Sequence, residues 1–159
     1  MKRGWVDLAQ ELSKIHSIIR DLFLIPVNSI NVLYLHAPFC ARRCSFCAYS
    51  AVVPSGQDEI RYFYEQELPA QIGFYREALK TVPFQQAFFG GGTPNLISGM
   101  MLDEMLARIP GFAKIPQKMI EVNPGTLTDE HMEVLCRWGF TLISMGVQTL
   151  DEGVLQKNN

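Results

Sequence analysis

Three cysteines, Cys40, Cys44 and Cys47, lie in one short segment with the spacing C-x3-C-x2-C. Three thiolates can hold three irons of a [4Fe–4S] cluster and leave the fourth iron open, whereas a closed structural cluster or zinc site takes four protein ligands. An open iron can bind a small molecule and pass it an electron. The count and the spacing therefore favour a reactive iron–sulfur site, and the chain must adopt a fold that presents this segment.

The composition indicates one globular domain. The chain has 159 residues, 48% of them hydrophobic, and a net charge of −2, so nothing in its charge favours nucleic acid or an anionic membrane as a partner. No apolar run reaches the roughly 18 residues that span a bilayer, and the N-terminus lacks the apolar core of a signal peptide. Clustered cysteines fit a metal site in a reducing compartment better than disulfides, so we expect a cytoplasmic protein.

The hydrophobic pattern predicts one helix followed by four β-α units. An apolar stripe at helical spacing covers residues 5–23 and ends before Pro26. The expected strands are residues 32–36, 86–89, 118–122 and 140–145. The expected helices that follow them are residues 58–79 with a break at Pro69, 96–109, 128–138 with Thr128 as N-cap, and one from about residue 150. Alternating units of this kind predict an α/β fold with a parallel sheet.

Each expected strand is followed by a distinctive loop. The four loops are the cysteine segment, Gly90-Gly91-Gly92-Thr93-Pro94, Glu121-Val122-Asn123-Pro124-Gly125 and Gly146-Val147-Gln148. In α/β folds the chemistry sits at the carboxyl ends of the strands. We therefore expect these loops to line one pocket at the same edge of the sheet.

These blocks, in this order, resemble the radical S-adenosylmethionine (SAM) superfamily. Within it they are similar to the branch that contains oxygen-independent coproporphyrinogen III dehydrogenase (HemN) and a haem chaperone (HemW). The resemblance covers about residues 32–156. It implies a partial TIM-like (β/α) barrel of about four βα units, preceded by an N-terminal helix. We expect residues 1–30 to form the helical segment and residues 31–159 to form a radical SAM core that is truncated at its C-terminus.

The resemblance also implies cofactors and site residues. Cys40, Cys44 and Cys47 match the ligands of a [4Fe–4S] cluster. The positions that match contacts to S-adenosyl-L-methionine are Tyr34, Phe46, Gly91, Gly92, Thr93, Glu121 and Gln148. A carboxylate can accept two hydrogen bonds from a ribose diol, and aromatic rings keep water from a radical.

The implied reaction is reductive cleavage of SAM to a 5′-deoxyadenosyl radical, which abstracts hydrogen from a substrate. The branch implies a porphyrinogen-like substrate and an electron donor such as flavodoxin or ferredoxin.

Each of these residues also has a purely structural explanation. The glycines can form a turn, Glu121 can be a solvated charge, Tyr34 and Phe46 can pack in the core, and Gln148 can be an ordinary loop amide. The cysteines can bind zinc, with His36 as a fourth ligand. The fourth cysteine, Cys136, falls in an expected helix, and we expect it to be a buried, inert thiol.

Two positions depart from the patterns of the branch. Tyr49 stands where the dehydrogenase pattern has a further cysteine, and Ala48 stands where the chaperone pattern often has an aspartate. Three functions therefore remain open from the sequence. They are a radical SAM enzyme of the coproporphyrinogen III oxidase type, a haem chaperone that keeps the cluster and carries haem, and a non-catalytic zinc module. An inactive fragment of the enzyme or of the chaperone is a further alternative.

Overall fold

The computed structural model describes residues 30–157, and the expected helix at residues 5–23 and the expected boundary near residue 30 lie outside or at the edge of this range. The strands are β1 (Val32–Ala37), β2 (Gln86–Gly91), β3 (Gln117–Val122) and β4 (Leu142–Met145). The α-helices are α2 (Gln57–Tyr62), α3 (Leu68–Phe74), α4 (Arg76–Thr81), α5 (Gly99–Ala107), α6 (Asp129–Arg137) and α7 (Glu152–Lys157). None of the helices in this range is long and apolar enough to cross a membrane.

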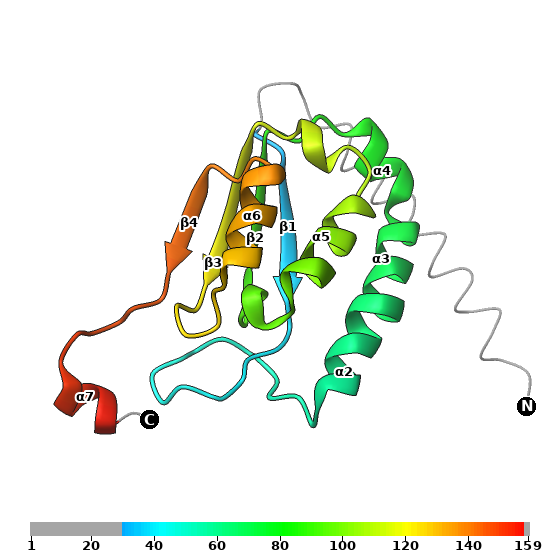
Figure 1. The fold of residues 1–159 in the computed structure, drawn as a ribbon. Helices are drawn as coiled ribbons and strands as arrows, with labels where there is room; N and C mark the ends of the chain where they lie inside the picture. The colour runs from blue at the N-terminus through cyan, green and yellow to red at the C-terminus, as the bar shows by residue number, and fades with distance from the viewer. Residues whose placement is uncertain (1–29, 158–159) are drawn as a thin grey trace, which may run out of the picture.

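The strands form one parallel sheet in the order β1-β2-β3-β4 (Figure 1). Tyr34 pairs with Phe88, Phe88 with Met119, and Met119 with Leu142. Strands that follow one another in the sequence are thus neighbours in the sheet, and each parallel connection passes through a helix. This confirms the expected α/β fold of about four βα units.

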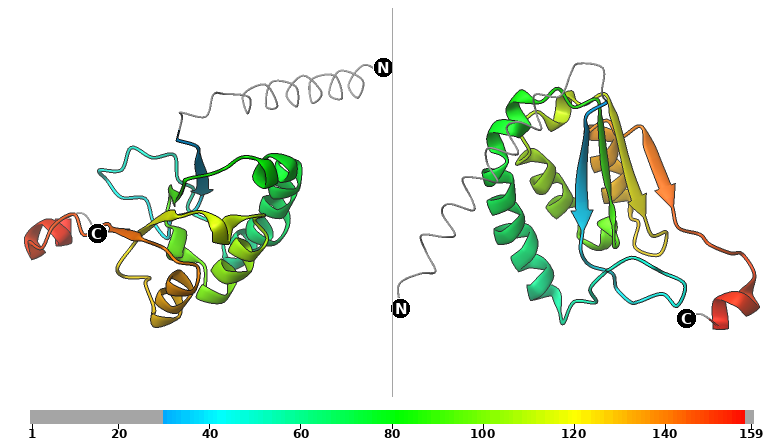
Figure 2. Two further views of the ribbon diagram at one scale, coloured as in Figure 1. Left: turned by 90° about the horizontal axis from the view of Figure 1, so that it is seen from above. Right: turned by 180° about the vertical axis from the view of Figure 1, so that it is seen from behind.

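Helices cover one face of the sheet, and this helix-covered face holds the core. Leu35, Phe89 and Ile120 of the strands are buried in one core cluster together with Leu102 and Leu106 of α5. The other face carries Tyr34, Phe88, Met119 and Leu142, and we call it the open face. In the right-hand view of Figure 2 no described helix lies over it. Alternate residues of the same strands therefore meet two different environments.

The expected helix at residues 58–79 is divided differently from the prediction. A π-helical turn, η1 (Phe63–Glu67), joins α2 to α3, and Pro69 lies in the first turn of α3. Proline lacks an N–H group and its ring clashes with the preceding turn, and a widened π turn can accommodate both effects. The chain bends instead at Tyr75, where φ is −90° and ψ is 9°. The kink or break expected at Pro69 therefore takes the form of a π-helical turn directly before this proline, and the helix is interrupted at Tyr75.

Helix α5 begins three residues later than expected because a 3-10 turn, η2 (Pro94–Leu96), comes first. The Ser98 side chain caps α5 by accepting a hydrogen bond from the Met101 N–H. The expected cap of α6 is confirmed, since the Thr128 side chain accepts a hydrogen bond from the His131 N–H. A further 3-10 turn, η3 (Phe112–Lys114), precedes β3.

Cys136 is exposed, so the prediction of a buried thiol was wrong. The buried residues of α6 are His131, Val134 and Leu135, at the spacing of one helix face. Cys136 directly follows this face and lies beyond its edge. Strand β4 also begins two residues later than expected, at Leu142.

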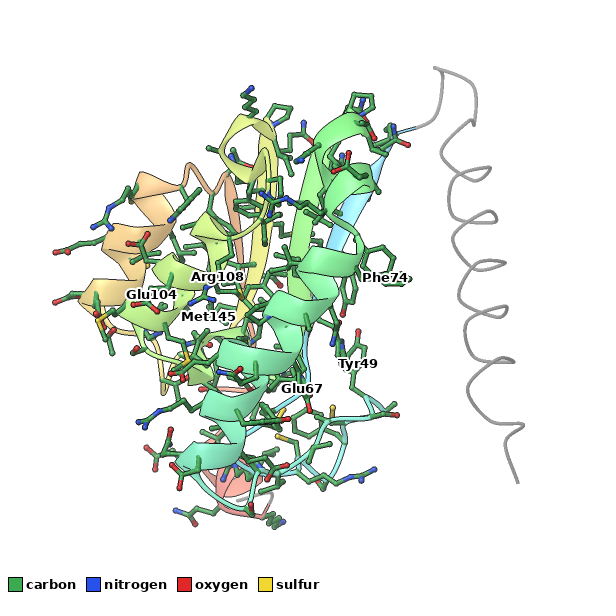
Figure 3. All side chains as sticks on the ribbon, turned by 90° about the vertical axis from the view of Figure 1, so that its right-hand side faces the viewer. Tyr49, Glu67, Phe74, Glu104, Arg108 and Met145 are labelled. Atoms are coloured by element: carbon green, nitrogen blue, oxygen red, sulfur yellow. The ribbon has the colours of Figure 1, made fainter. Side chains whose placement is uncertain are left out.

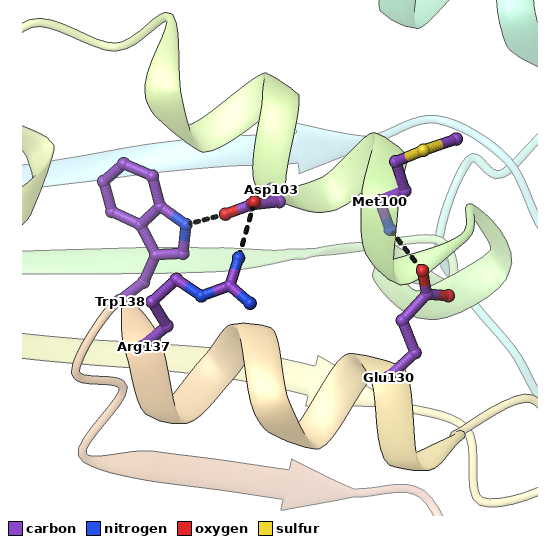
Figure 4. Close-up of polar contacts among 5 residues, drawn as sticks. All are labelled: Met100, Asp103, Glu130, Arg137 and Trp138. Atoms are coloured by element: carbon purple, nitrogen blue, oxygen red, sulfur yellow. Dashed lines mark hydrogen bonds and ion pairs between the residues drawn. The ribbon is translucent and has the colours of Figure 1, made fainter.

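Polar contacts join α5 to α6 (Figure 4). Asp103 accepts hydrogen bonds from Trp138 Nε1 at 2.6 Å and from the Arg137 guanidinium at 2.7 Å. Glu130 accepts hydrogen bonds from the backbone N–H groups of Gly99 and Met100, both at 3.1 Å. Because these N–H groups have no partner within the first turn of α5, Glu130 caps one helix from the next.

Candidate functional site

The cysteines occupy a long loop at the carboxyl end of β1, which we call the cysteine loop (residues 38–53; Figure 1). Its two ends are tied together at the base. The Cys40 N–H donates to the Val52 carbonyl at 3.0 Å, and the Val52 N–H donates to the Pro38 carbonyl at 2.9 Å. Phe39 and Val52 form an isolated parallel bridge. The loop therefore leaves the sheet from a defined base that lies directly before Cys40.

The three cysteines line one pocket. The pocket is lined by Cys40, Arg42, Arg43, Cys44, Cys47, Tyr49, Ala51 and Val53. All three thiols are free and half-buried, so they can reach a ligand in the pocket. This donor set fits a [4Fe–4S] cluster with an open iron, because each thiolate in such a cluster binds a different iron.

His36 is not grouped with the three cysteines in the described part of the chain. Among residues 30–157, no three His, Cys, Asp or Glu side chains are grouped so that they could hold one metal ion. His36, the fourth ligand in the zinc alternative, is hydrogen-bonded through Nδ1 to the Tyr34 hydroxyl at 3.3 Å. The ring therefore belongs to the open face of the sheet.

The glycines at the end of β2 allow this strand end to pack against the base of the cysteine loop. The Gly92 N–H donates to the Ala37 carbonyl and the Thr93 N–H donates to the Phe39 carbonyl, each at 2.7 Å. A Cβ atom at Gly92 would collide with the backbone of Phe39, and one at Gly91 would collide with the ring of His36. Gly91 also has a φ of 106°, which favours glycine. These glycines are therefore required by packing, whatever ligand they also contact.

Thr93 links the end of β2 to a cysteine. Its Oγ1 donates a hydrogen bond to Cys40 Sγ at 3.4 Å. This contact joins two residues that the sequence assigned to different parts of the site, one to the cluster and one to SAM.

Glu121 lies beside the glycines on the open face. Its carboxylate accepts a hydrogen bond from the Gly91 N–H at 3.3 Å. A Cβ atom at Gly90 would lie 2.8 Å from Glu121 Oε2, so the missing side chain there makes room for the carboxylate. A carboxylate at the carboxyl edge of a parallel sheet is well placed to accept hydrogen bonds from a ligand bound there.

Tyr34 shares this region with Glu121 and Tyr49. Burial raises the pKa of Tyr34, and the negative charges of Glu121 and of ionised Tyr49 raise it further. Figure 3 shows Tyr49 on the cysteine loop, and Tyr49 also lines the cysteine pocket. Our sequence reasoning noted Tyr49 only as a departure from a family pattern, because nothing local predicted that the loop would bring it close to Tyr34.

Two expected contact residues lie at the surface. Phe46 is exposed at the outer part of the cysteine loop. Gln148 is exposed and has a left-handed φ of 62°, and its side-chain amide folds towards Gly146 of its own loop. The structure therefore groups Thr93 with Cys40 and Glu121 with Gly91. The cluster and SAM roles of all the predicted site residues, Phe46 and Gln148 included, stay predictions.

The sequence reasoning missed Asn95, which fastens the loop after β2 to the loop after β3. Its Nδ2 donates to the Asn123 carbonyl at 2.9 Å, and its Oδ1 accepts a hydrogen bond from the Asn123 N–H at 2.8 Å. Only 2% of Asn95 is exposed. His131 adds a second link, with its Nε2 at 2.7 Å from the Ile97 carbonyl. Asn95 is a single polar residue after a proline, and nothing in the local sequence predicted its two hydrogen bonds to Asn123.

Comparison with known families identifies the superfamily of the chain. The model of the radical SAM superfamily matches residues 34–159. The chain belongs to the radical SAM superfamily.

Individual relatives come from the branch expected from the sequence. The chain is 33% identical over 130 residues to the heme chaperone HemW of Lactococcus lactis, covering 80% of this chain and 33% of that protein. It is 37% identical over 125 residues to the oxygen-independent coproporphyrinogen III oxidase of Helicobacter pylori, covering 75% of this chain and 27% of that protein.

The structure is similar to that of coproporphyrinogen III oxidase (HemN) from Escherichia coli, which is described as a radical SAM enzyme. The TM-score is 0.70 at 26% identity, and the match covers 85% of this chain and 32% of that one. The chain thus spans about a third of the length of these relatives.

Proposed function

We propose that Cys40, Cys44 and Cys47 bind a [4Fe–4S] cluster and that SAM binds at its open iron, in a radical enzyme of porphyrin and haem metabolism. The observation that carries this proposal is the shared pocket of the three cysteines, beside a glycine-rich strand end and Glu121. Residues 31–159 would provide the radical SAM core. When bound, the cluster supplies the electron that cleaves SAM to a 5′-deoxyadenosyl radical.

The residues of the chain would place the cofactor and exclude water. Glu121 would accept hydrogen bonds from the ribose hydroxyls of SAM, and the strand end at Gly91 and Gly92 would receive its methionine group. Tyr34, which is exposed on the open face near Glu121, would form a wall of the adenosyl site. The Tyr34 hydroxyl, like that of any tyrosine, is protonated at neutral pH, so it can donate a hydrogen bond there. A dry, preorganised site of this kind protects a radical and strengthens polar contacts.

A porphyrinogen-like substrate is the proposal that best fits the relatives and the pocket. The Helicobacter pylori relative and the HemN structure are both coproporphyrinogen III oxidases by name. Arg42 and Arg43 line the cysteine pocket and can pair with carboxylates of a substrate. Reduction of the cluster would draw on a small redox protein such as flavodoxin or ferredoxin.

The test is anaerobic reconstitution with iron and sulfide, followed by EPR of the dithionite-reduced protein with and without SAM. We expect a [4Fe–4S]⁺ signal that changes when SAM is added. Single serine variants of Cys40, Cys44 and Cys47 should lose it, whereas Cys136→Ser, which removes an exposed cysteine of α6, should retain it. A signal that survives in the three variants, or one zinc per chain without iron, would contradict the proposal.

A second candidate function, haem binding by a chaperone, rests on the similarity to HemW. Haem titration and turnover of coproporphyrinogen III separate the two functions. Tight haem binding without a decarboxylated product would favour the chaperone. Product formation that depends on SAM would favour the oxidase.

A further inference from the structure

The hydroxyl group of Thr93 approaches a cysteine sulfur from outside the cysteine loop. Thr93 Oγ1 lies 3.4 Å from Cys40 Sγ and is the donor of that hydrogen bond. The Thr93 side chain is half-buried, which limits competition from water for the same contact. This arrangement adds to the proposed function, on which it rests, because it concerns the chemistry of the cysteine that would bind the cluster.

Backbone contacts hold Thr93 in place on one side. The Thr93 N–H donates to the Phe39 carbonyl at 2.7 Å, one residue before Cys40. The Gly92 N–H donates to the Ala37 carbonyl at the same distance. The end of β2 thus continues its pairing with the chain beyond the end of β1. The donor and the acceptor sulfur are therefore fixed to adjoining segments of backbone.

Asn95 holds the same loop on its other side. Its two hydrogen bonds to the backbone of Asn123 tie the loop after β2 to the end of β3. A reciprocal pair with both atoms of a buried amide satisfied resists rotation of the side chain. Thr93 is therefore held between the base of the cysteine loop and the strand that carries Glu121.

Hydrogen bonds to cysteine sulfurs help to set the reduction potential of an iron–sulfur cluster. A donor stabilises the sulfur more when the cluster carries the extra electron, so it raises the potential. A hydroxyl has one proton to donate and two lone pairs that accept. Thr93 can therefore donate to Cys40 and still accept a hydrogen bond from the ammonium group of a bound ligand.

We infer that Thr93 is a positioning residue whose hydroxyl donates to the sulfur of cluster-bound Cys40 and raises the reduction potential of the cluster. Thr93→Val removes the hydroxyl and keeps the branched shape of the side chain. Thr93→Ser keeps the hydroxyl and removes the methyl group.

The experiment is a redox titration of the reconstituted full chain, followed by EPR of the reduced cluster. We expect a lower midpoint potential in Thr93→Val and a value near that of the unchanged chain in Thr93→Ser. Thr81→Val is the matched control, because the Thr81 hydroxyl donates to the Glu77 carbonyl in α4. Its potential should not change. Resonance Raman gives a second readout, since loss of a hydrogen bond to Sγ should raise an Fe–S(Cys) stretching frequency.

The outcomes separate this inference from the proposed function. A cluster that forms in Thr93→Val with an unchanged potential and unchanged Fe–S frequencies overturns the role of Thr93 and leaves the cluster assignment standing. Absence of any cluster from the unchanged chain overturns both. If Thr93→Val is less folded by circular dichroism, Thr93→Ala tests the same loss of the hydroxyl without a branched side chain, and the potential must again fall.

Discussion

The two faces of the sheet are built from the same strands and yet differ in what surrounds them. On the helix-covered face, Phe89 and Ile120 are buried under α5 and α6. On the open face, Tyr34 is 49% exposed and Leu142 is 55% exposed. Parallel sheets are commonly covered on both faces, so the open face is the unusual one. It is also the face to which Glu121 and Tyr34 belong.

This difference predicts that stability depends mainly on the helix-covered face and that ligand chemistry depends mainly on the open face. On the open face, the aligned residues Tyr34, Phe88, Met119 and Leu142 form an apolar row across all four strands. Polar side chains follow it towards the carboxyl edge. Substitutions on the helix-covered face should therefore change the free energy of unfolding, whereas those at the open face and the strand ends should change ligand chemistry first.

The largest expected change in stability comes from replacing a leucine by alanine on each of the two faces of the sheet. Leu102 of α5 is fully buried, and Leu142 is 55% exposed on the open face. We expect Leu102→Ala to lower the free energy of unfolding by about 2–5 kcal/mol, since it leaves a cavity. Leu142→Ala should change it by about 0.5 kcal/mol or less. Urea unfolding followed by circular dichroism measures both. Equal losses would mean that the open face is buried in solution.

The next effect concerns the link between two strand ends. Asn95→Ala leaves the Asn123 N–H without its partner, whereas the Asn123 carbonyl still accepts a hydrogen bond from the Thr126 N–H at 3.2 Å. We expect a loss of about 1–3 kcal/mol. The matched change Asn123→Ala removes a hydrogen bond from the Gly125 N–H at an exposed site, and it should cost about 0.5–1 kcal/mol. The same unfolding experiment compares them. A smaller loss for Asn95→Ala than for Asn123→Ala would show that Asn95 does not fasten the two loops.

A smaller effect lies within the helical layer. Glu130→Ala removes the hydrogen bonds to the Gly99 and Met100 N–H groups and leaves the Ser98 cap of α5 in place, and it should cost about 1 kcal/mol. Arg137→Ala breaks the exposed ion pair with Asp103 (Figure 4) and should cost about 0.2–1 kcal/mol. Thermal unfolding at low and high salt distinguishes them, because the ion pair is screened and the Arg137 effect should shrink with salt. A salt-independent loss for Arg137→Ala would point to packing instead.

The smallest effect is electrostatic and lies on the open face. Glu121→Gln should lower the pKa of Tyr34, because it removes a negative charge that raises it, while burial, the larger cause, remains. Ultraviolet titration of tyrosinate measures the shift, and Tyr34→Phe identifies the signal. If the pKa of Tyr34 is unchanged in Glu121→Gln, the Glu121 charge does not act on the Tyr34 hydroxyl in solution.

The same shift gives a pH dependence. Tyr34 holds its proton more tightly in the folded chain than in the unfolded chain, where tyrosines have a pKa of about 10. The folded state therefore binds more protons above that pH, and stability should fall as the pH rises through this range. The fall should be slightly shallower in Tyr34→Phe.

The order of elements and the position of the cysteines could be predicted because the signals are local. The period of the apolar residues marked each strand and helix, and Thr128 marked the start of α6. The interruption of the helix at Tyr75 and the exposure of Cys136 could not be predicted in the same way. Both depend on how a helix packs against neighbouring elements, and the spacing of apolar residues in the sequence does not give that packing.

The partners of the site residues were also beyond the sequence. Asn95 and Asn123 are 28 positions apart, and Thr93 and Cys40 are 53 positions apart. Their contacts arise because parallel pairing brings the carboxyl ends of β1, β2 and β3 to one edge. No feature next to Asn95 or Tyr49 indicated which side chain it would meet.

The sequence by itself determined the class of the protein, since three cysteines at fixed spacing and four strand-end motifs in order identify a radical SAM chain. Short-range spacing and periodicity can be read from the sequence without any knowledge of the tertiary structure. Only the tertiary structure decided that Thr93 contacts Cys40, that Glu121 rests on Gly91, and that one face of the sheet is open. These facts depend on strand register and on the packing of distant segments, which the chain acquires only when it folds.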